Sequence, residues 1–154
     1  MDIRELRDLL RQPGARTGVG VWLLPHHYLG QEDEIAIRLG VEPLDARDAY
    51  LRTLPEGARF SGLTRADGYQ NLTQLLYELT RQLHGRDCLL VHTLDVLLLG
   101  LETDERERFW RDALEGLPYP RTKLILTVPE KATEILTAAL QRRYAALLAD
   151  GAIE

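Results

Sequence analysis

The sequence is poor in cysteine, in long apolar runs and in net positive charge, and each shortage excludes a class of protein. The single cysteine, Cys88, cannot form an internal disulfide. Its place in the apolar run Cys88-Leu89-Leu90-Val91 predicts a buried small side chain rather than a catalytic thiol. No apolar run approaches the roughly 20 residues that span a bilayer, so we expect no membrane contact. A formal net charge of −5 argues against an extended nucleic-acid footprint.

The first residues also lack the apolar block of a secretory signal, because acids and arginines alternate with leucines from Met1 to Arg11. We therefore expect a cytoplasmic protein. No internal repeat or low-complexity linker divides the 154 residues. We interpret residues 1–154 as one domain, with an N-terminal helix in 1–16, a core in 17–129, and a C-terminal helix and tail in 130–154.

Apolar runs that end at turn-forming residues predict the strands. Residues 18–24 form such a run before Pro25, and residues 88–91 and 123–128 form two more. Continuous apolar runs of this length suit strands that are covered on both faces. Residues 41–44 predict an edge strand, because Pro43 would remove a hydrogen bond from a central one.

Apolar residues at helical spacing predict helices between these strands. The expected helices cover residues 3–11, 32–39 (ended by Gly40), 45–54 (capped by Asp45), 69–84, and 103–115 (capped by Thr103). A long C-terminal helix opened by Pro129 is expected to bury Ile135, Leu136, Ala139, Leu140 and Leu147. This alternation predicts an α/β fold, a three-layer α/β/α sandwich with a mainly parallel sheet. Ligands of such sheets bind beyond the carboxyl ends of the strands.

The segment after the first predicted strand fits the length and position of a phosphate-binding P-loop. That motif needs a glycine, four residues, a second glycine, a lysine and a serine or threonine. Residues 25–32 match its length, with Pro25 at the first glycine position and Gly30 at the second. Gln31 replaces the lysine, and Glu32 replaces the hydroxyl that binds magnesium. The lost cation and the added anion would repel a polyphosphate by several kcal/mol, as an order of magnitude.

The second half of a nucleotide site is altered in the same sense. The apolar run 89–91 leads to His92, where the Walker B aspartate of an ATPase would bind magnesium, and Asp95 lies close to the position of the catalytic acid. Histidine suits magnesium poorly, because that ion prefers oxygen ligands. Thr127 occupies the position of a polar residue that senses the terminal phosphate in related ATPases. Seven residues therefore define a degenerate nucleotide site: Pro25, Gly30, Gln31, Glu32, His92, Asp95 and Thr127.

The order and spacing of these segments resemble the small P-loop protein of type 3 bacteriophage-exclusion (BREX) systems. The stretches 40–44, 90–98 and 119–124 carry the resemblance, which covers about residues 17 to 130. It implies a P-loop NTPase-like fold and a role beside other proteins in prokaryotic phage defence. Together with the degenerate site, it favours a non-catalytic interaction module without a cofactor, in which His26, His27 and Tyr28 are candidate partner contacts.

Other interpretations remain open at this stage. Another doubly wound fold, flavodoxin-like or Rossmann-like, would show the same alternation of strands and helices. A metal- or nucleotide-dependent enzyme could use His26, His27 and His92 with Asp95 or Glu32 as ligands or acid–base groups. If one strand separates the parent strands of these histidines, their spacing is about 10 Å.

A nucleic-acid-binding adaptor is the third functional interpretation. Arg4, Arg7 and Arg11 share one face of the first predicted helix, although acidic residues lie between them. Such a role would give DNA binding that weakens with salt and with the loss of these arginines.

Overall fold

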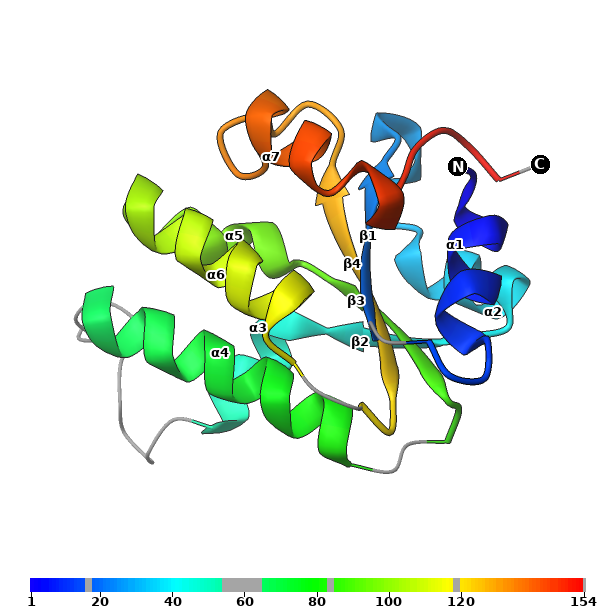
Figure 1. The fold of residues 1–154 in the computed structure, drawn as a ribbon, viewed down its shortest axis with the longest axis horizontal. Helices are drawn as coiled ribbons and strands as arrows, with labels where there is room; N and C mark the ends of the chain where they lie inside the picture. Colours follow the sequence, from blue (N-terminus) through cyan, green and yellow to red (C-terminus); the bar gives the residue numbers. More distant parts are fainter. Residues whose placement is uncertain (16–17, 54–64, 83–84, 118–119, 154) are drawn as a thin grey trace.

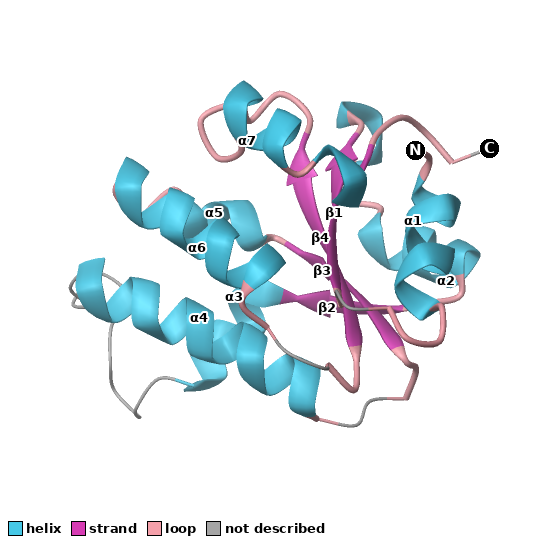
Figure 2. Cartoon of the chain, viewed as in Figure 1, coloured by secondary structure: helices cyan, strands magenta, loops and turns pink. Residues whose placement is uncertain are grey.

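The computed structural model describes residues 1–15, 18–53, 65–82, 85–117 and 120–153. One five-stranded sheet runs through the molecule, and helices cover both of its faces (Figures 1 and 2). All four strand pairings are parallel. The predicted α/β architecture with a parallel sheet is therefore confirmed.

The strands are β1 (Val19–Leu24), β2 (Glu42–Asp45), β3 (Cys88–His92), β4 (Lys123–Pro129) and β5 (Leu148–Ala149). Their order across the sheet is β2-β3-β4-β1-β5, so β4 lies between β3 and β1. In both the Rossmann and the flavodoxin orders β1 is a neighbour of β2. The described sheet has neither order, because β1 pairs with β4 and β5.

The helices are α1 (Ile3–Arg11), α2 (Glu32–Leu39), α3 (Ala46–Thr53), α4 (Arg65–Arg81), α5 (Leu94–Leu98), α6 (Thr103–Glu115) and α7 (Ala138–Arg143). Two 3₁₀ turns, η1 (His26–Tyr28) and η3 (Ala145–Leu147), complete the described elements. None of the helices in the described ranges is long and apolar enough to cross a bilayer.

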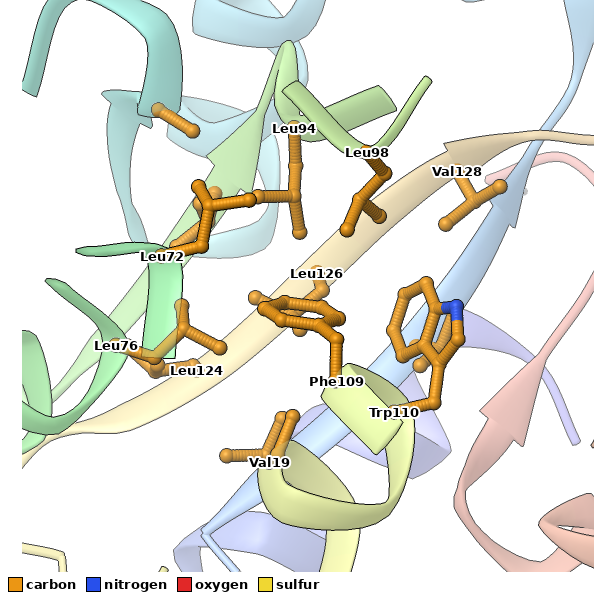
Figure 3. Packing of buried hydrophobic residues seen from close by; sticks show 14 of the residues in the cluster. Val19, Leu72, Leu76, Leu94, Leu98, Phe109, Trp110, Leu124, Leu126 and Val128 are labelled. Carbon is orange, nitrogen blue, oxygen red and sulfur yellow. The ribbon is translucent and has the colours of Figure 1, made fainter. Parts of the chain in front are cut away.

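The side chains of the strands alternate between two hydrophobic clusters, one on each face of the sheet. On the face covered by α3 to α6, which we call the α4/α6 face, strand residues such as Val19 and Leu126 pack against Phe109 and Trp110 (Figure 3). On the opposite α1/α2 face, strand residues such as Trp22 pack against helices α1 and α2. Because both faces are covered, the central strands are mainly apolar, with Lys123 and Thr127 of β4 and His92 of β3 as exceptions.

Most predicted elements occur close to their expected positions. Helix α2 has the predicted bounds and ends at Gly40, whose φ of 72° is left-handed. The side chain of Asp45 accepts a hydrogen bond from the Asp48 amide at 3.1 Å and so caps α3. Helix α6 begins at Thr103, but its cap is Glu102, whose amide donates to Glu105 Oε1 at 3.0 Å. The predicted helix ends at residues 54 and 84 lie outside the described residues.

The long C-terminal helix predicted from Pro129 is wrong. Pro129 is the last residue of β4 and pairs with Leu24, and the Glu130 amide then donates to Leu24 O at 3.0 Å. Turns, the six-residue α7, η3 and β5 follow instead of one helix. Ile135 and Leu136 are buried as expected, whereas Ala139 is exposed. Residues 148–149 pair with the edge of β1 as a strand, which a helix continued through this segment would not allow.

Helix α5 was not expected from the sequence pattern. It has five residues, directly follows β3, and buries Leu94, Leu97 and Leu98 against the α4/α6 face. A helix this short has too few residues to show a helical period.

Candidate functional site

Residues 25–31 join β1 directly to α2, as the P-loop interpretation requires. Pro25 follows the strand, residues 26–28 form the turn η1, and α2 begins at Glu32. Gly30 has a φ of 88°, and no atom lies within 4 Å of the place where a Cβ would be. The glycine is therefore needed for its left-handed backbone rather than for a close approach.

The backbone amides of this loop are engaged inside the loop itself. The Tyr28 amide donates to Pro25 O at 3.0 Å, and the Leu29 amide donates to His26 O at 3.2 Å. The Gln31 amide donates to Tyr28 O at 2.9 Å. A P-loop turns such amides toward the phosphates instead, so this loop would have to break its own hydrogen bonds to do the same.

Two further amides of the loop are bound by carboxylates of the protein. The Gly30 amide donates to Glu32 Oε1 at 3.2 Å, and the His26 amide donates to Glu130 Oε1 at 3.1 Å. Glu32 comes from the first turn of α2, and Glu130 directly follows β4. These oxygens occupy donors of the kind that bind phosphate oxygens in an NTPase.

Gln31, at the position of the P-loop lysine, also faces back into the loop. Its side-chain amide donates to His27 O at 3.2 Å. This bond is short-range and keeps the neutral amide beside the turn η1. The residue thus supplies neither a positive charge nor an outward-reaching donor to this part of the site.

His92 lies close to the N-terminal turn of α2. Its Nε2 atom is 3.5 Å from Oδ1 of Asp33, and its Nδ1 atom is 2.8 Å from the Thr93 hydroxyl. The His92 side chain is 12% exposed and that of Asp33 is 79% exposed. In an ATPase, the residue before Asp33 and the residue at His92 would both bind magnesium. Here an imidazole and a carboxylate face each other in the same region.

Thr93 holds an unusual backbone conformation at this edge of the sheet. Its φ of 64° is the only positive value of a non-glycine residue among the described residues. A β-branched residue in this region is strained, because its side chain crowds the backbone. In this backbone conformation the Thr93 hydroxyl lies beside the His92 ring.

Thr127 and Asp95 do not join these groups in a common network. The Thr127 hydroxyl is buried within the sheet and donates to Val91 O at 3.3 Å. The hydroxyl therefore hydrogen-bonds to a carbonyl of the neighbouring strand β3 and does not point beyond the sheet edge. Asp95 is half-buried in the first turn of α5.

The three candidate partner contacts differ in their exposure. His26 and His27 are exposed, and the His27 ring lies 4.2 Å from the Tyr28 ring. Tyr28 is only 9% exposed and packs against Trp22 at a ring-centre distance of 6.1 Å. The expectation of a surface contact at Tyr28 is therefore corrected, because its ring belongs to the cluster of the α1/α2 face.

The metal hypothesis receives no support from the described part of the chain. One strand, β4, does separate β1 and β3, as that hypothesis assumed. Nevertheless, the residues that the structure describes contain no group of three His, Cys, Asp or Glu side chains suited to a metal ion. His92 instead contacts Asp33 and Thr93.

Two of the three arginines of the nucleic-acid hypothesis bind the C-terminal end of α2. Arg7 Nη1 donates to Leu39 O at 2.6 Å, and Arg11 Nη2 donates to Gly40 O at 2.9 Å. Arg11 also forms an ion pair with Asp87 at 2.9 Å. Cations are favourable at a helix C-terminus, so these two side chains have a structural role.

The site residues Asp33 and Glu130 are not expected from a P-loop comparison, yet both had a signal in the sequence. Asp33 belongs to the consecutive acids Glu32, Asp33 and Glu34 at the start of α2, and Glu130 directly follows β4. Acidic residues at a helix N-terminus interact favourably with its amides. The run of acids therefore indicates that carboxylate side chains bind backbone amides near the start of α2.

No protein-family model, curated protein or solved structure shows a significant match to the chain.

Proposed function

We propose that this protein is a non-catalytic, P-loop-like interaction module that acts as an accessory subunit of a multi-protein assembly. The observation that carries the proposal is the occupation of the loop amides by Glu32 and Glu130. To bind a polyphosphate, the loop would have to release both carboxylates and then hold the phosphate close to them. Like charges at such distances repel strongly when water is partly excluded.

The arrangement of the strands supports a P-loop ancestry for the scaffold. Strand β4 carries Thr127 and lies between the strand before the loop and the strand that ends at His92. Three separate segments of the sequence therefore end at one edge of the sheet, where a parallel sheet binds its ligands. The scaffold retains this convergence, while Gln31, Glu32 and His92 depart from the chemistry of an ATPase.

The same edge has features of a surface that contacts protein. Leu29 in the loop is 41% exposed, Val96 of α5 is 43% exposed, and Leu99, directly after α5, is 51% exposed. Acidic side chains of the first turn of α2 lie beside the loop. Exposed apolar residues next to charged ones are typical of protein interfaces. The proposed role in phage defence rests on the BREX resemblance, which names the kind of assembly.

Nucleotide binding provides the first test. We expect no change in the melting temperature of the protein when magnesium-ATP is added, for the wild type and for Gly30→Ala alike. Gly14→Ala is the matched control, because Gly14 also has a left-handed φ, of 79°, and open space around it. A nucleotide-dependent shift that Gly30→Ala abolishes and Gly14→Ala retains would overturn the proposal.

Complex formation with the proteins encoded beside this one provides the second test. We expect one of them to form a complex that survives size-exclusion chromatography and that Val96→Ser with Leu99→Ser weakens about tenfold or more. Tyr77→Ser is the control, since Tyr77 is 43% exposed but lies on α4. Equal weakening by the control, or no complex with any of these proteins, would contradict the assignment of this edge.

A further inference from the structure

A short segment after β5 lies over the loop that follows β1. Residues 150–153, which we call the strap, contain no helix or strand, yet Ile153 is only 7% exposed. Figure 1 shows this end of the chain beside the first residues of α1, and the Asp150 amide donates to Met1 O at 3.2 Å. The strap is therefore fixed to the body of the protein although it has no regular structure.

Two aromatic side chains form hydrogen bonds with the backbone of the strap. Trp22 of β1 donates its indole N–H to Gly151 O at 3.1 Å. The Tyr28 hydroxyl accepts a hydrogen bond from the Ile153 amide at 3.2 Å and lies 3.5 Å from Ile153 O. Tyr28 belongs to the turn η1, so this buried residue of the loop connects the loop to the strap.

The strap itself has no strand pairing with the sheet. Strand β5 before it has two residues and pairs only with Val21 and Trp22. Segments with few backbone hydrogen bonds open at a lower free-energy cost than the strands of the core. When the strap leaves, the Tyr28 side chain loses its hydrogen bond to Ile153 and the apolar cover of that residue. The ring then no longer holds the Tyr28 amide and carbonyl in the hydrogen bonds that close the loop.

We infer that the strap is a conformational lock which keeps the loop 25–31 in its closed, internally hydrogen-bonded form. A ligand or partner that takes up residues 150–153 releases Tyr28 and thereby frees the loop amides. The coupling concerns the shape of the loop and holds whether or not the loop contacts a partner protein. It makes the strap a regulatory element for the carboxyl edge of the sheet.

Amide hydrogen exchange measured by NMR on the full chain tests this lock. In Ile153→Ala we expect the amides of Tyr28, Leu29 and Gln31 to exchange about tenfold faster or more, while the amides of β4 keep their rates. Ile37→Ala is the matched control, because Ile37 is 72% exposed on the neighbouring α2 and its truncation removes no buried contact. Unchanged loop exchange in Ile153→Ala, together with faster exchange in the strap, would overturn the inference.

Tyr28→Phe tests the coupling from the other side and keeps the buried ring, so the protein remains folded. The variant removes only the hydroxyl that accepts from the Ile153 amide. We expect faster exchange of the Ile153 amide and, because the strap is loosened, of the Gln31 amide as well. If the Ile153 amide alone responds, the strap opens without affecting the loop, and the lock does not exist.

Discussion

The two faces of the sheet bury similar side chains but are built from different kinds of segment. On the α4/α6 face, helices and the turns around α7 supply the apolar cover. On the α1/α2 face, the cluster also contains Tyr28 from the loop and Ile153 from the strap. The loop 25–31 therefore contributes to the hydrophobic core on the α1/α2 face only. A change in packing on that face should reach the loop, whereas an equal change on the other face should not.

The two tryptophans give the largest test of this difference, because each is fully buried and donates its indole N–H to a carbonyl. Trp110 donates to Ile135 O at 2.9 Å on the α4/α6 face, and Trp22 donates to Gly151 O at 3.1 Å on the α1/α2 face. We expect Trp110→Ala and Trp22→Ala each to lower the free energy of unfolding by about 3–5 kcal/mol, measured by urea denaturation.

Only Trp22→Ala should also accelerate amide exchange in the loop beyond the change in global stability. Trp110→Ala serves as the control of equal size and burial. Loop exchange that rises equally in both variants would show that the two faces are not independent.

Cys88 gives an effect of intermediate size on the α1/α2 face. Burial raises the pKa of its thiol from 9.0 to about 12, and Asp87 adds to the rise, while Arg11 lowers the pKa. Between pH 9.0 and about 12, the Cys88 thiol loses its proton in the unfolded chain but keeps it in the folded protein. Stability should therefore fall as pH rises above 9, by about 1.4 kcal/mol per unit, as an order of magnitude. Urea denaturation of the wild type and of Cys88→Ala between pH 8 and about 10.5 measures the difference.

Tyr69, on the α4/α6 face, also titrates, and its effect on stability can be separated from that of Cys88 by the pH at which it occurs. Burial and the hydrogen bond to Asp112 raise the pKa of Tyr69 above its ordinary value of 10.0. Its contribution to stability is likewise lost at higher pH, but only from about pH 10 upward. A wild-type stability that is flat from pH 9 to 10 would contradict the burial of Cys88.

The contact between Asp33 and His92 should give the smallest effect, because Asp33 is 79% exposed. Exposed ion pairs typically contribute about 0.2–1 kcal/mol. A double-mutant cycle with Asp33→Asn and His92→Gln should give a coupling energy in this range, reduced by salt. A coupling well above it would show that this pair fixes α2 to β3 more firmly than its exposure suggests.

The parts of the fold that depend on local sequence could be predicted, and those that depend on tertiary contacts could not. The apolar strands and α2 have strong local signals, including the left-handed Gly40. Residues 138–149 are rich in alanine and leucine and favour a long helix. Without β5, strand β1 would be the edge of the described sheet, and its pairing with Leu148 and Ala149 outweighs that helical preference.

The candidate site divides in the same way. The loop and the ends of β3 and β4 follow from the strand pattern, so the convergence of Gly30, His92 and Thr127 on neighbouring elements could be expected. The hydrogen-bond partner of each polar group could not be expected. Glu130 lies 104 residues from the His26 amide that it binds, and Thr127 bonds a carbonyl of the next strand. Such pairings depend on strand order, which no local pattern contains.

Thr93 shows that this edge of the protein is not optimised for folding stability alone. Its left-handed backbone raises the energy of the native state and not of the unfolded chain. Glycine would adopt the same conformation without that cost, but it has no hydroxyl to bind the imidazole. Threonine thus gives the His92 ring a partner at Nδ1, while Asp33 lies near Nε2, so the strained residue contributes to the contacts that orient this ring.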